Sequence, residues 1–437
     1  MVHFEDQDSQ LIPSIIPSFS YQTMADQFVS ISRINQYYGL LVLYNCVANI
    51  WLSLVGRTAL KQNLIAPSKE VTKKLAVVTG SNTGIGFETA RRLVQEHGWD
   101  VILACRSKDK ALMAKDRINE SITESGGNRE TRGKAIVLEP VLDLSDFDSI
   151  RTYANALQTE YGCIDVLINN AGLNTSGRSP GNPELNLMFQ SNYLGHFLLT
   201  DLLLKNEVLL SASEDGNPRA AKIINLSSVM HHFSKGDSLD GKGFESIEST
   251  EYWERRALYT DDDPPSGVYA ASKLAAILHA AELNKRYGHK NLTAIAVNPG
   301  GVNSDIWRGF PMWLRRHVFE RVYLTTKQGS EPIIAAAIRG DLRIEKANSM
   351  ESDARGAIIY IQPYANPFTI FGGRWFADSS AAESECRKSQ FRKGPMPIFS
   401  EMIGPYVGHL LTIPRLPTNT AAAAQSLWRV SEQLTKL

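Results

Sequence analysis

Residues 74–98 read KLAVVTGSNTGIGFETARRLVQEHG and contain three local patterns in a fixed order. The run LAVVT is apolar and partly β-branched, which predicts a buried strand. Gly80, Gly84 and Gly86 predict a tight turn, and the helical spacing that follows ends at Gly98. Glycines between a strand and a helix let the backbone approach a pyrophosphate, which the N–H groups of the helix start can bind. The stretch therefore predicts a nucleotide-binding unit.

Further apolar runs recur along the chain, with helical segments between them. They are VILACRS (101–107), KAIVLEPVLDL (134–144), IDVLINNAG (164–172), AKIINLSS (221–228) and LTAIAVNPGG (292–301). This alternation predicts right-handed crossovers and an α/β fold with a doubly wound, mainly parallel sheet, the Rossmann fold. Ligands of such sheets bind at the carboxyl ends of the strands. Asp143, Asn170, Ser228 and Pro299 are expected at that edge.

The length of 437 residues allows one large domain with appendages. We expect an N-terminal segment over 1–70, a nucleotide-binding catalytic domain over 71–345, and a C-terminal extension over 346–437. The extension contains a predicted last strand at 356–364 and a terminal helix, AAAAQSLWRVSEQLTKL. Basic and acidic residues number 46 each, which gives no indication of nucleic-acid binding. The four scattered cysteines predict neither a disulfide framework nor a zinc site, and no metal is expected.

Residues 34–56 carry no charged side chain. As a helix they would cover about 34 Å, against a membrane hydrocarbon core of about 30 Å. The segment predicts a membrane anchor. A helix packed against the domain is the alternative, because Asn45 and Asn49 would have to lose water inside lipid. Basic residues are denser after the segment than before it, so we expect the catalytic domain to face the cytosol from an endoplasmic reticulum or lipid-droplet membrane.

Arg106 ends the second predicted strand, twenty residues beyond Gly86. An Asp or Glu near this distance binds the ribose hydroxyls of NAD, whereas an arginine matches the 2′-phosphate of NADP. A solvated arginine at a strand end is the alternative. The spacing favours NADP(H) as the cofactor.

Seven motifs follow one another at characteristic distances. They are TGSNTGIG (79–86), DL (143–144), NNAG (169–172), QSNYLGHF (190–197), NLSS (225–228), YAASK (269–273) and NPGGVNS (298–304). Together they resemble the short-chain dehydrogenase/reductase superfamily. ILACRS, LDLSDFDSIR and the terminal SLWRVSEQL are similar to its retinol-dehydrogenase-like and WW-domain-oxidoreductase-like group. The resemblance implies an enzyme that interconverts a carbonyl and its alcohol by hydride transfer with NADP(H).

The resemblance assigns catalytic roles to Asn192, Ser228, Tyr269 and Lys273. Tyr269 would be the general acid and base, and Ser228, favoured over Ser227, would hydrogen-bond the substrate oxygen. Lys273 lies one helical turn from the tyrosine and would also hold the nicotinamide ribose. Lowering the phenol pKa by about three units requires about 4 kcal/mol, which the ammonium and an oxidised nicotinamide can supply. Asn192 would position a relay water, or else bond only to backbone.

The resemblance also assigns cofactor contacts to residues of six motifs. Arg106 and Asp143 with Leu144 would contact the adenosine end, and Val302 with Ser304 the carboxamide. Ser304 stands where the family usually has threonine. The full set is Gly80, Ser81, Asn82, Gly84, Ile85, Gly86, Arg106, Asp143, Leu144, Asn170, Ala171, Gly172, Tyr269, Lys273, Pro299, Gly300, Val302 and Ser304.

The chain departs from the family between Ser228 and Tyr269. This stretch is long, polar and acidic, which predicts a surface excursion that either selects substrate or is inert decoration. Asp261, Asp262 and Asp263 are expected in a solvated loop. After Ser304, an aromatic segment predicts either an apolar lid or a helix packed on the domain. Its aromatic and apolar residues are Trp307, Phe310, Met312, Trp313 and Phe319.

An apolar pocket beside a membrane anchor predicts a lipophilic substrate and a role in lipid metabolism. A non-catalytic NADP(H)-binding scaffold or redox sensor is the alternative function. Many relatives pair through helices at 185–205 and 267–287, which leaves a homodimer open, although an anchor could replace that contact.

Overall fold

The computed structural model describes residues 74–124, 133–210, 220–228, 247–261, 265–304, 324–339 and 419–436, with single residues and pairs between some of these ranges. The predicted anchor over 34–56 and the segment over 1–70 lie outside the described residues. Of the helices that the structure describes, none has both the length and the apolar character needed to cross a membrane.

The core of the fold is a seven-stranded sheet in which every pair of neighbouring strands is parallel. Its order is β3-β2-β1-β4-β5-β6-β7. The strands are β1 (Leu75–Thr79), β2 (Asp100–Ala104), β3 (Ala135–Ile136), β4 (Val166–Asn169), β5 (Ala221–Leu226), β6 (Leu292–Val297) and β7 (Tyr360–Ile361). The order reverses between β1 and β4, which is where ligands of such sheets bind. The predicted doubly wound parallel sheet is confirmed.

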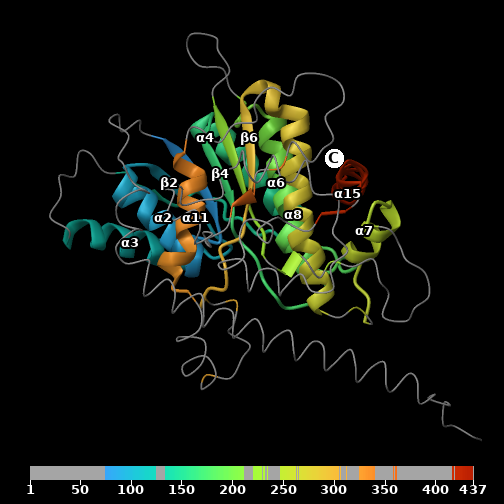
Figure 1. Ribbon diagram of the computed structural model, residues 1–437. Coiled ribbons are helices and arrows are strands. Elements are labelled where there is room, and N and C mark those ends of the chain that lie inside the picture. Colours follow the sequence, from blue (N-terminus) through green and yellow to red (C-terminus); the bar gives the residue numbers. More distant parts are fainter. Residues whose placement is uncertain are drawn as a thin grey trace, which may run out of the picture.

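Helices cover both faces of the sheet (Figure 1). One face packs against α2 (Gly84–His97), α3 (Lys108–Glu124) and α11 (Thr326–Ile338). The other packs against α4 (Phe147–Tyr161), α6 (Gly195–Lys205) and α8 (Pro265–Tyr287). Successive strand residues alternate between the two cores: Leu167 faces α6 and α8, whereas Ile168 faces α2 and α11. This alternation explains why the strands read as continuous apolar runs.

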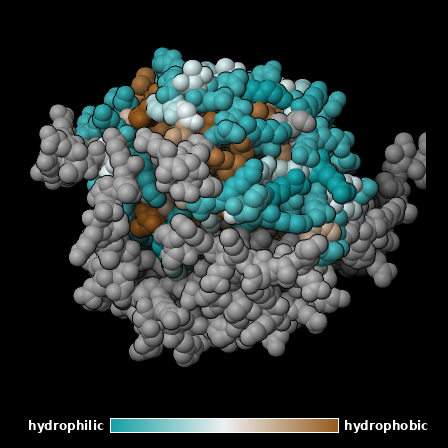
Figure 2. Space-filling model, turned by 90° about the horizontal axis from the view of Figure 1, so that it is seen from above, coloured by the Kyte–Doolittle hydropathy of each residue, from teal (hydrophilic) through white to brown (hydrophobic). Residues whose placement is uncertain are grey.

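Few large apolar side chains of the described part reach the surface. Those that do are Leu112, Met113, Leu258 and Met312. Hydrophilic residues cover most of the described surface in the view of Figure 2, with hydrophobic residues in smaller areas. Of the five residues predicted to form a lid, the structure describes only Met312, whose side chain is exposed.

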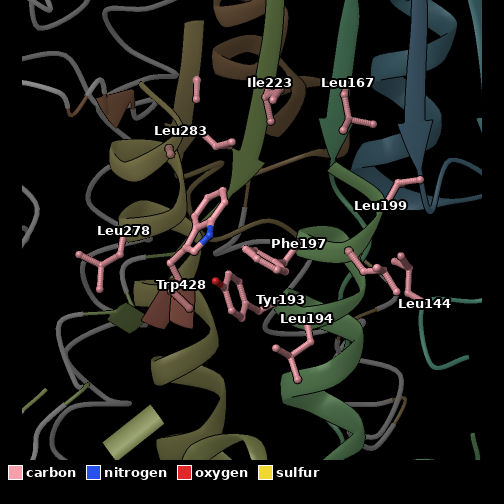
Figure 3. Packing of buried hydrophobic residues seen from close by; sticks show 14 of the residues in the cluster. Leu144, Leu167, Tyr193, Leu194, Phe197, Leu199, Ile223, Leu278, Leu283 and Trp428 are labelled. Atoms are coloured by element: carbon pink, nitrogen blue, oxygen red, sulfur yellow. The ribbon is translucent and has the colours of Figure 1, made fainter. Parts of the chain in front are cut away.

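The C-terminal helix α15 (Thr420–Thr435) packs along α8 and α7 (Thr250–Ala257). The Trp428 indole meets the Phe197 ring edge to face, with the ring centroids 4.9 Å apart (Figure 3). The Arg286 guanidinium lies 4.2 Å from the centre of the indole. The hydroxyls of Tyr193 and Ser431 are 2.9 Å apart. The helix thus occupies a face of α8, one of the two helices through which pairing is predicted, and a homodimer remains a prediction.

The segment between Ser228 and Tyr269 contains part of the core, which corrects the expectation of a surface excursion. In α7 the side chains of Tyr252 and Trp253 are buried. Trp253 donates its indole N–H to the Ile247 carbonyl over 2.9 Å. The acidic composition gives no indication of this short helix, because two aromatic residues are enough to anchor its roughly two turns.

Asp263 corrects the second expectation for this segment, that of a solvated acidic loop. Its side chain is buried and pairs with the Arg256 guanidinium over 3.2 Å. Asp261 is exposed, as expected of a loop residue, and accepts a hydrogen bond from the Tyr259 hydroxyl. A buried carboxylate needs a partner, and the basic last turn of α7 supplies it.

Replacing Trp428 by alanine should lower the free energy of unfolding by about 3–5 kcal/mol, because the buried indole leaves a cavity between α15 and α8. Urea unfolding followed by circular dichroism measures this loss. The neighbouring Arg429→Ala is the control, since Arg429 is exposed, and should change stability by less than about 0.5 kcal/mol. Equal losses for the two variants would contradict the packing role of the indole.

Candidate active site

The turn between β1 and α2 requires glycine at three positions. Gly80 and Gly84 have φ angles of +63° and +62°, in the left-handed region that favours glycine. A β-carbon on Gly86 would lie 2.3 Å from the Asn170 amide nitrogen and 2.6 Å from the Gly80 carbonyl oxygen. The turn therefore lies directly against the loop that follows β4, at the point where the strand order reverses.

Thr79 joins these two loops. Its hydroxyl oxygen accepts hydrogen bonds from the backbone N–H groups of Asn170 and Ala171, both over 2.9 Å. The Asn170 side chain donates to the Thr79 carbonyl over 2.7 Å. These bonds hold the ends of β1 and β4 together, so the Asn170 amide has a structural role in addition to the cofactor contact predicted for it.

Gly172 brings the loop after β4 to the predicted catalytic residues. A β-carbon there would lie 3.3 Å from Asn192 Oδ1 and 3.5 Å from Lys273 Nζ. Asn192 is buried in the π-helix η2 (Gln190–Leu194), and such bulges occur frequently at functional sites. Its carboxamide accepts from the Leu173 N–H over 2.8 Å and donates to the Leu173 carbonyl and the Ser272 hydroxyl. The amide therefore ties the loop to α8.

Tyr269, Lys273 and Ser228 lie together at the carboxyl end of β5. The Ser228 hydroxyl lies beside the Tyr269 phenol. The Lys273 ammonium donates to the Leu226 carbonyl over 3.0 Å and lies 5.5 Å from the centre of the Tyr269 ring. The adjacent Ser227 instead donates to the Lys273 carbonyl over 2.8 Å. Ser227 thus fixes the helix, and Ser228 is the serine that reaches the tyrosine.

Burial sets the protonation of this pair. It raises the pKa of Tyr269 to about 12, although the nearby Ser228 hydroxyl opposes the shift. Burial also lowers the pKa of Lys273 to about 8. The lowered phenol pKa is predicted for the ammonium acting together with an oxidised nicotinamide, whereas in the protein alone desolvation sets the pKa. At neutral pH the phenol therefore carries its proton and can act as an acid.

The remaining predicted cofactor residues surround the glycine turn. Arg106 is exposed just beyond β2 and forms no hydrogen bond or ion pair with another described residue. Asp143 accepts from the Ser145 N–H and hydroxyl over 2.9 and 2.6 Å, so its carboxylate shapes its own loop. Leu144 is buried, and Ser81 lies against the Cys105 thiol. The half-buried Asn82 and Ile85 complete the turn.

The loop after β6 approaches the same turn from the other side. A β-carbon on Gly84 would lie 3.6 Å from the Ser304 β-carbon. Gly300 has a φ angle of +83°, and its N–H donates to the Asn298 side chain. The preceding Pro299 is buried. Val302 packs its side chain against Gly329 of α11, so any contact with a carboxamide would come from its backbone.

Several residues that position the site had no role in the motif analysis. The Leu226 carbonyl and the Ser272 hydroxyl hold Lys273 and Asn192. His196 contacts both Thr79 and Asn192, and its only sequence signal is its place one turn after Asn192 in QSNYLGHF. No group of three or more potential metal ligands occurs in the part of the chain that the structure describes.

Residues 74–236 match the family model of the short chain dehydrogenase. The chain is 32% identical over 322 residues to retinol dehydrogenase 11 of Homo sapiens, covering 73% of this chain and 89% of that protein. The chain belongs to the short-chain dehydrogenase/reductase superfamily. Retinol dehydrogenase 12 of Mus musculus is 34% identical over 274 residues, 62% of this chain and 76% of the relative. The predicted family and its retinol-dehydrogenase-like group are confirmed.

A short-chain dehydrogenase/reductase is an oxidoreductase that acts on an alcohol or carbonyl with a nicotinamide nucleotide. The residues present fit such a nucleotide. The turn at Gly80, Gly84 and Gly86 offers backbone without side chains at the start of α2, which suits a pyrophosphate. Gly172, in the loop after β4, lies against Lys273 and Asn192. The reacting end of the nucleotide would lie there.

Two buried histidines next to the site should make the fold acid-sensitive. Burial lowers the pKa of His196 to about 4 and that of His279 to about 3, from an ordinary value of 6.5. The unfolded chain therefore binds two protons that the folded chain excludes, and stability falls as the pH falls below 6.5. Between about pH 5.5 and 4, protonation of these two groups should lower the free energy of unfolding by about 3 kcal/mol per pH unit.

Urea unfolding at a series of pH values measures this slope. Replacing His279 by phenylalanine should remove about half of the contribution, because one of the two groups is gone. A slope that is the same in the variant and the wild type would contradict the assignment.

Proposed function

We propose that the protein is an NADP(H)-dependent, membrane-associated oxidoreductase that interconverts a lipophilic carbonyl compound and its alcohol. The observation that carries the proposal is the meeting of Ser228, Tyr269 and Lys273 beside Gly172, which adjoins the glycine turn. Such a site can deliver a proton to an oxygen next to a bound nicotinamide, which would supply or accept the hydride.

In reduction, Tyr269 donates its hydroxyl proton to the carbonyl oxygen of the substrate. At neutral pH this phenol carries its proton, so the proton is available for transfer. The Ser228 hydroxyl hydrogen-bonds the same oxygen and holds the carbonyl toward the phenol. The Lys273 ammonium stabilises the phenolate that remains and hydrogen-bonds the nicotinamide ribose. In alcohol oxidation the same residues act in reverse.

Arg106 supports NADP(H) over NAD(H). Its guanidinium is exposed at the carboxyl end of β2 and has no partner among the described residues, so it is free to pair with an anion. A charged 2′-phosphate next to the adenosine end matches this position. Cellular NADP is kept mostly reduced, which makes carbonyl reduction the favoured direction.

The lipophilic substrate is proposed from the relatives. The chain is similar to retinol dehydrogenases, whose named substrate is an apolar alcohol. A retinoid-type aldehyde, a lipid aldehyde or a sterol ketone has the corresponding chemistry. Anchoring through residues 34–56 at an endoplasmic reticulum or lipid-droplet membrane, with the catalytic domain in the cytosol, would bring the enzyme to such compounds.

Replacing Tyr269 by phenylalanine should reduce kcat for NADPH-dependent reduction of retinaldehyde and decanal by at least about 10³-fold, because the variant cannot donate the proton. NADPH binding, measured by its fluorescence, should change little. Tyr259→Phe, which removes a half-buried phenol that is bonded to Asp261, is the matched control and should keep wild-type kcat. Wild-type protein that binds NADPH without reducing any lipophilic carbonyl would favour a non-catalytic scaffold or redox sensor.

Replacing Arg106 by alanine should weaken NADPH binding about 10–100-fold, as expected for the loss of a charge-assisted hydrogen bond to phosphate. NADH binding should change by less than about threefold, because NADH lacks the 2′-phosphate. Isothermal titration of both nucleotides gives the two constants, and Lys110→Ala on α3 serves as a control for general loss of charge. Comparable losses for both nucleotides would overturn the preference for NADP(H).

A further inference from the structure

His196 is buried and forms hydrogen bonds to two elements of the site. They are Thr79, at the end of β1, and Asn192, in the π-helix η2. His196 lies at the start of α6 and is 3% exposed. Its Nδ1 is 3.1 Å from the Asn192 carbonyl oxygen, and its Nε2 is 2.9 Å from the Thr79 hydroxyl. The imidazole is therefore bonded on both sides, to β1 on one and to the π-helix on the other.

The bonding pattern assigns every hydrogen in this link. A carbonyl oxygen can only accept, so Nδ1 of His196 carries the hydrogen. The neutral imidazole then accepts at Nε2, and the Thr79 hydroxyl must be the donor. The same hydroxyl also lies 3.3 Å from the Ile168 carbonyl, but its one hydrogen serves the shorter bond. Its lone pairs accept from the N–H groups of Asn170 and Ala171.

The link continues from Asn192 to the catalytic helix. The Asn192 side chain binds both backbone groups of Leu173 and donates to Ser272, the residue before Lys273. Ser272 in turn donates to the Tyr269 carbonyl over 2.7 Å. A continuous set of hydrogen bonds therefore runs from the nucleotide loops, through one imidazole, to the helix that carries the proton donor.

We infer that His196 is a positioning residue for hydride transfer, which holds the Asn192 turn and α8 at a fixed distance from the nucleotide loops. The inference rests on the proposed function and adds a residue to it. Through its bond to Asn192, His196 supports the part of the site near Lys273, whereas the glycines of the turn and Arg106 would contact the nucleotide directly. Its loss should therefore impair the chemical step more than nucleotide binding.

The test compares His196→Phe with the wild type in the reduction of retinaldehyde and decanal by NADPH. Phenylalanine fills the space of the imidazole but makes neither hydrogen bond. We expect kcat to fall about 10–100-fold, as for a small misplacement of reacting groups. The Kd for NADPH should stay within about threefold of the wild type, with the fraction of folded protein unchanged.

His279→Phe is the matched control. His279 is another buried histidine, and its ring lies 5.8 Å from that of Tyr193 and 5.4 Å from that of Phe197. Its Nδ1 faces Asn225, on the strand β5, and it forms no hydrogen bond with Thr79 or Asn192. This variant should keep kcat within about threefold of the wild type.

A double-mutant cycle with Thr79→Val tests whether His196 acts through Thr79. In the Thr79→Val background, adding His196→Phe should reduce kcat by less than about threefold further, because the link is already broken. The Thr79→Ser background keeps the hydroxyl. In this background, adding His196→Phe should again reduce kcat about 10–100-fold. Should His196→Phe fail to fold, His196→Leu, which also removes both hydrogen bonds, should show the same loss of kcat.

Three results would overturn the inference. They are an unchanged kcat in His196→Phe, parallel losses of kcat, NADPH binding and folded fraction, or a full loss that persists in the Thr79→Val background. Wild-type protein that reduces no lipophilic aldehyde with NADPH would instead refute the proposed function. The wild-type measurement thus separates the two failures.

Discussion

The close approach of two loops and the helix α8 at the carboxyl edge of the sheet is the constraint on which the site depends. A β-carbon on Gly86 would collide with the Asn170 amide, and one on Gly172 would press against Asn192 and Lys273. Glycine at these positions lets the turn after β1, the loop after β4 and the helix α8 meet within a few ångströms. Backbone N–H groups at the start of α2 and the proton-donating side chains are therefore parts of one compact site.

Burial of α8 gives this site its chemistry. Most of the helix lies inside the protein, between β5, β6 and the C-terminal helix, so its tyrosine and lysine are both desolvated. Desolvation favours the neutral form of each group, which keeps the Tyr269 phenol protonated and makes the Lys273 ammonium easier to deprotonate. The hydrogen bonds from Lys273 to Leu226 and from Ser227 to Lys273 fix the helix against β5. The packing that fixes the position of α8 therefore also desolvates Tyr269 and Lys273 and sets their protonation.

The helices α7 and α15 support the site from behind. The helix α15 packs on α8 through Trp428, and α7 from the long segment before Tyr269 packs on α15. Hydrogen bonds of Ser426 to the Glu248 carbonyl, and of the Asn419 N–H to the Glu248 carboxylate, connect the two. Segments that lie far apart in the sequence therefore stabilise the back of the catalytic helix, a contribution that their acidic or alanine-rich composition does not indicate.

The sequence by itself determined the parallel sheet, the family and the candidate residues, because these depend on local patterns. Apolar runs predict the strands, and glycines predict the turn. The four-residue spacing of Tyr269 and Lys273 places both side chains on one face of a helix. The roles of the candidate residues and of the N-terminal segment remain predictions that these patterns support.

Only the tertiary structure decided which neighbours each side chain meets. Adjacent serines in NLSS differ because one hydroxyl faces the Lys273 carbonyl and the other the Tyr269 phenol. The pKa of Tyr269 in the protein alone is raised, because desolvation depends on everything packed around the ring. His196 and Thr79 come together from positions 117 residues apart. Burial and long-range hydrogen bonds are properties of the packed chain, and no local pattern contains them.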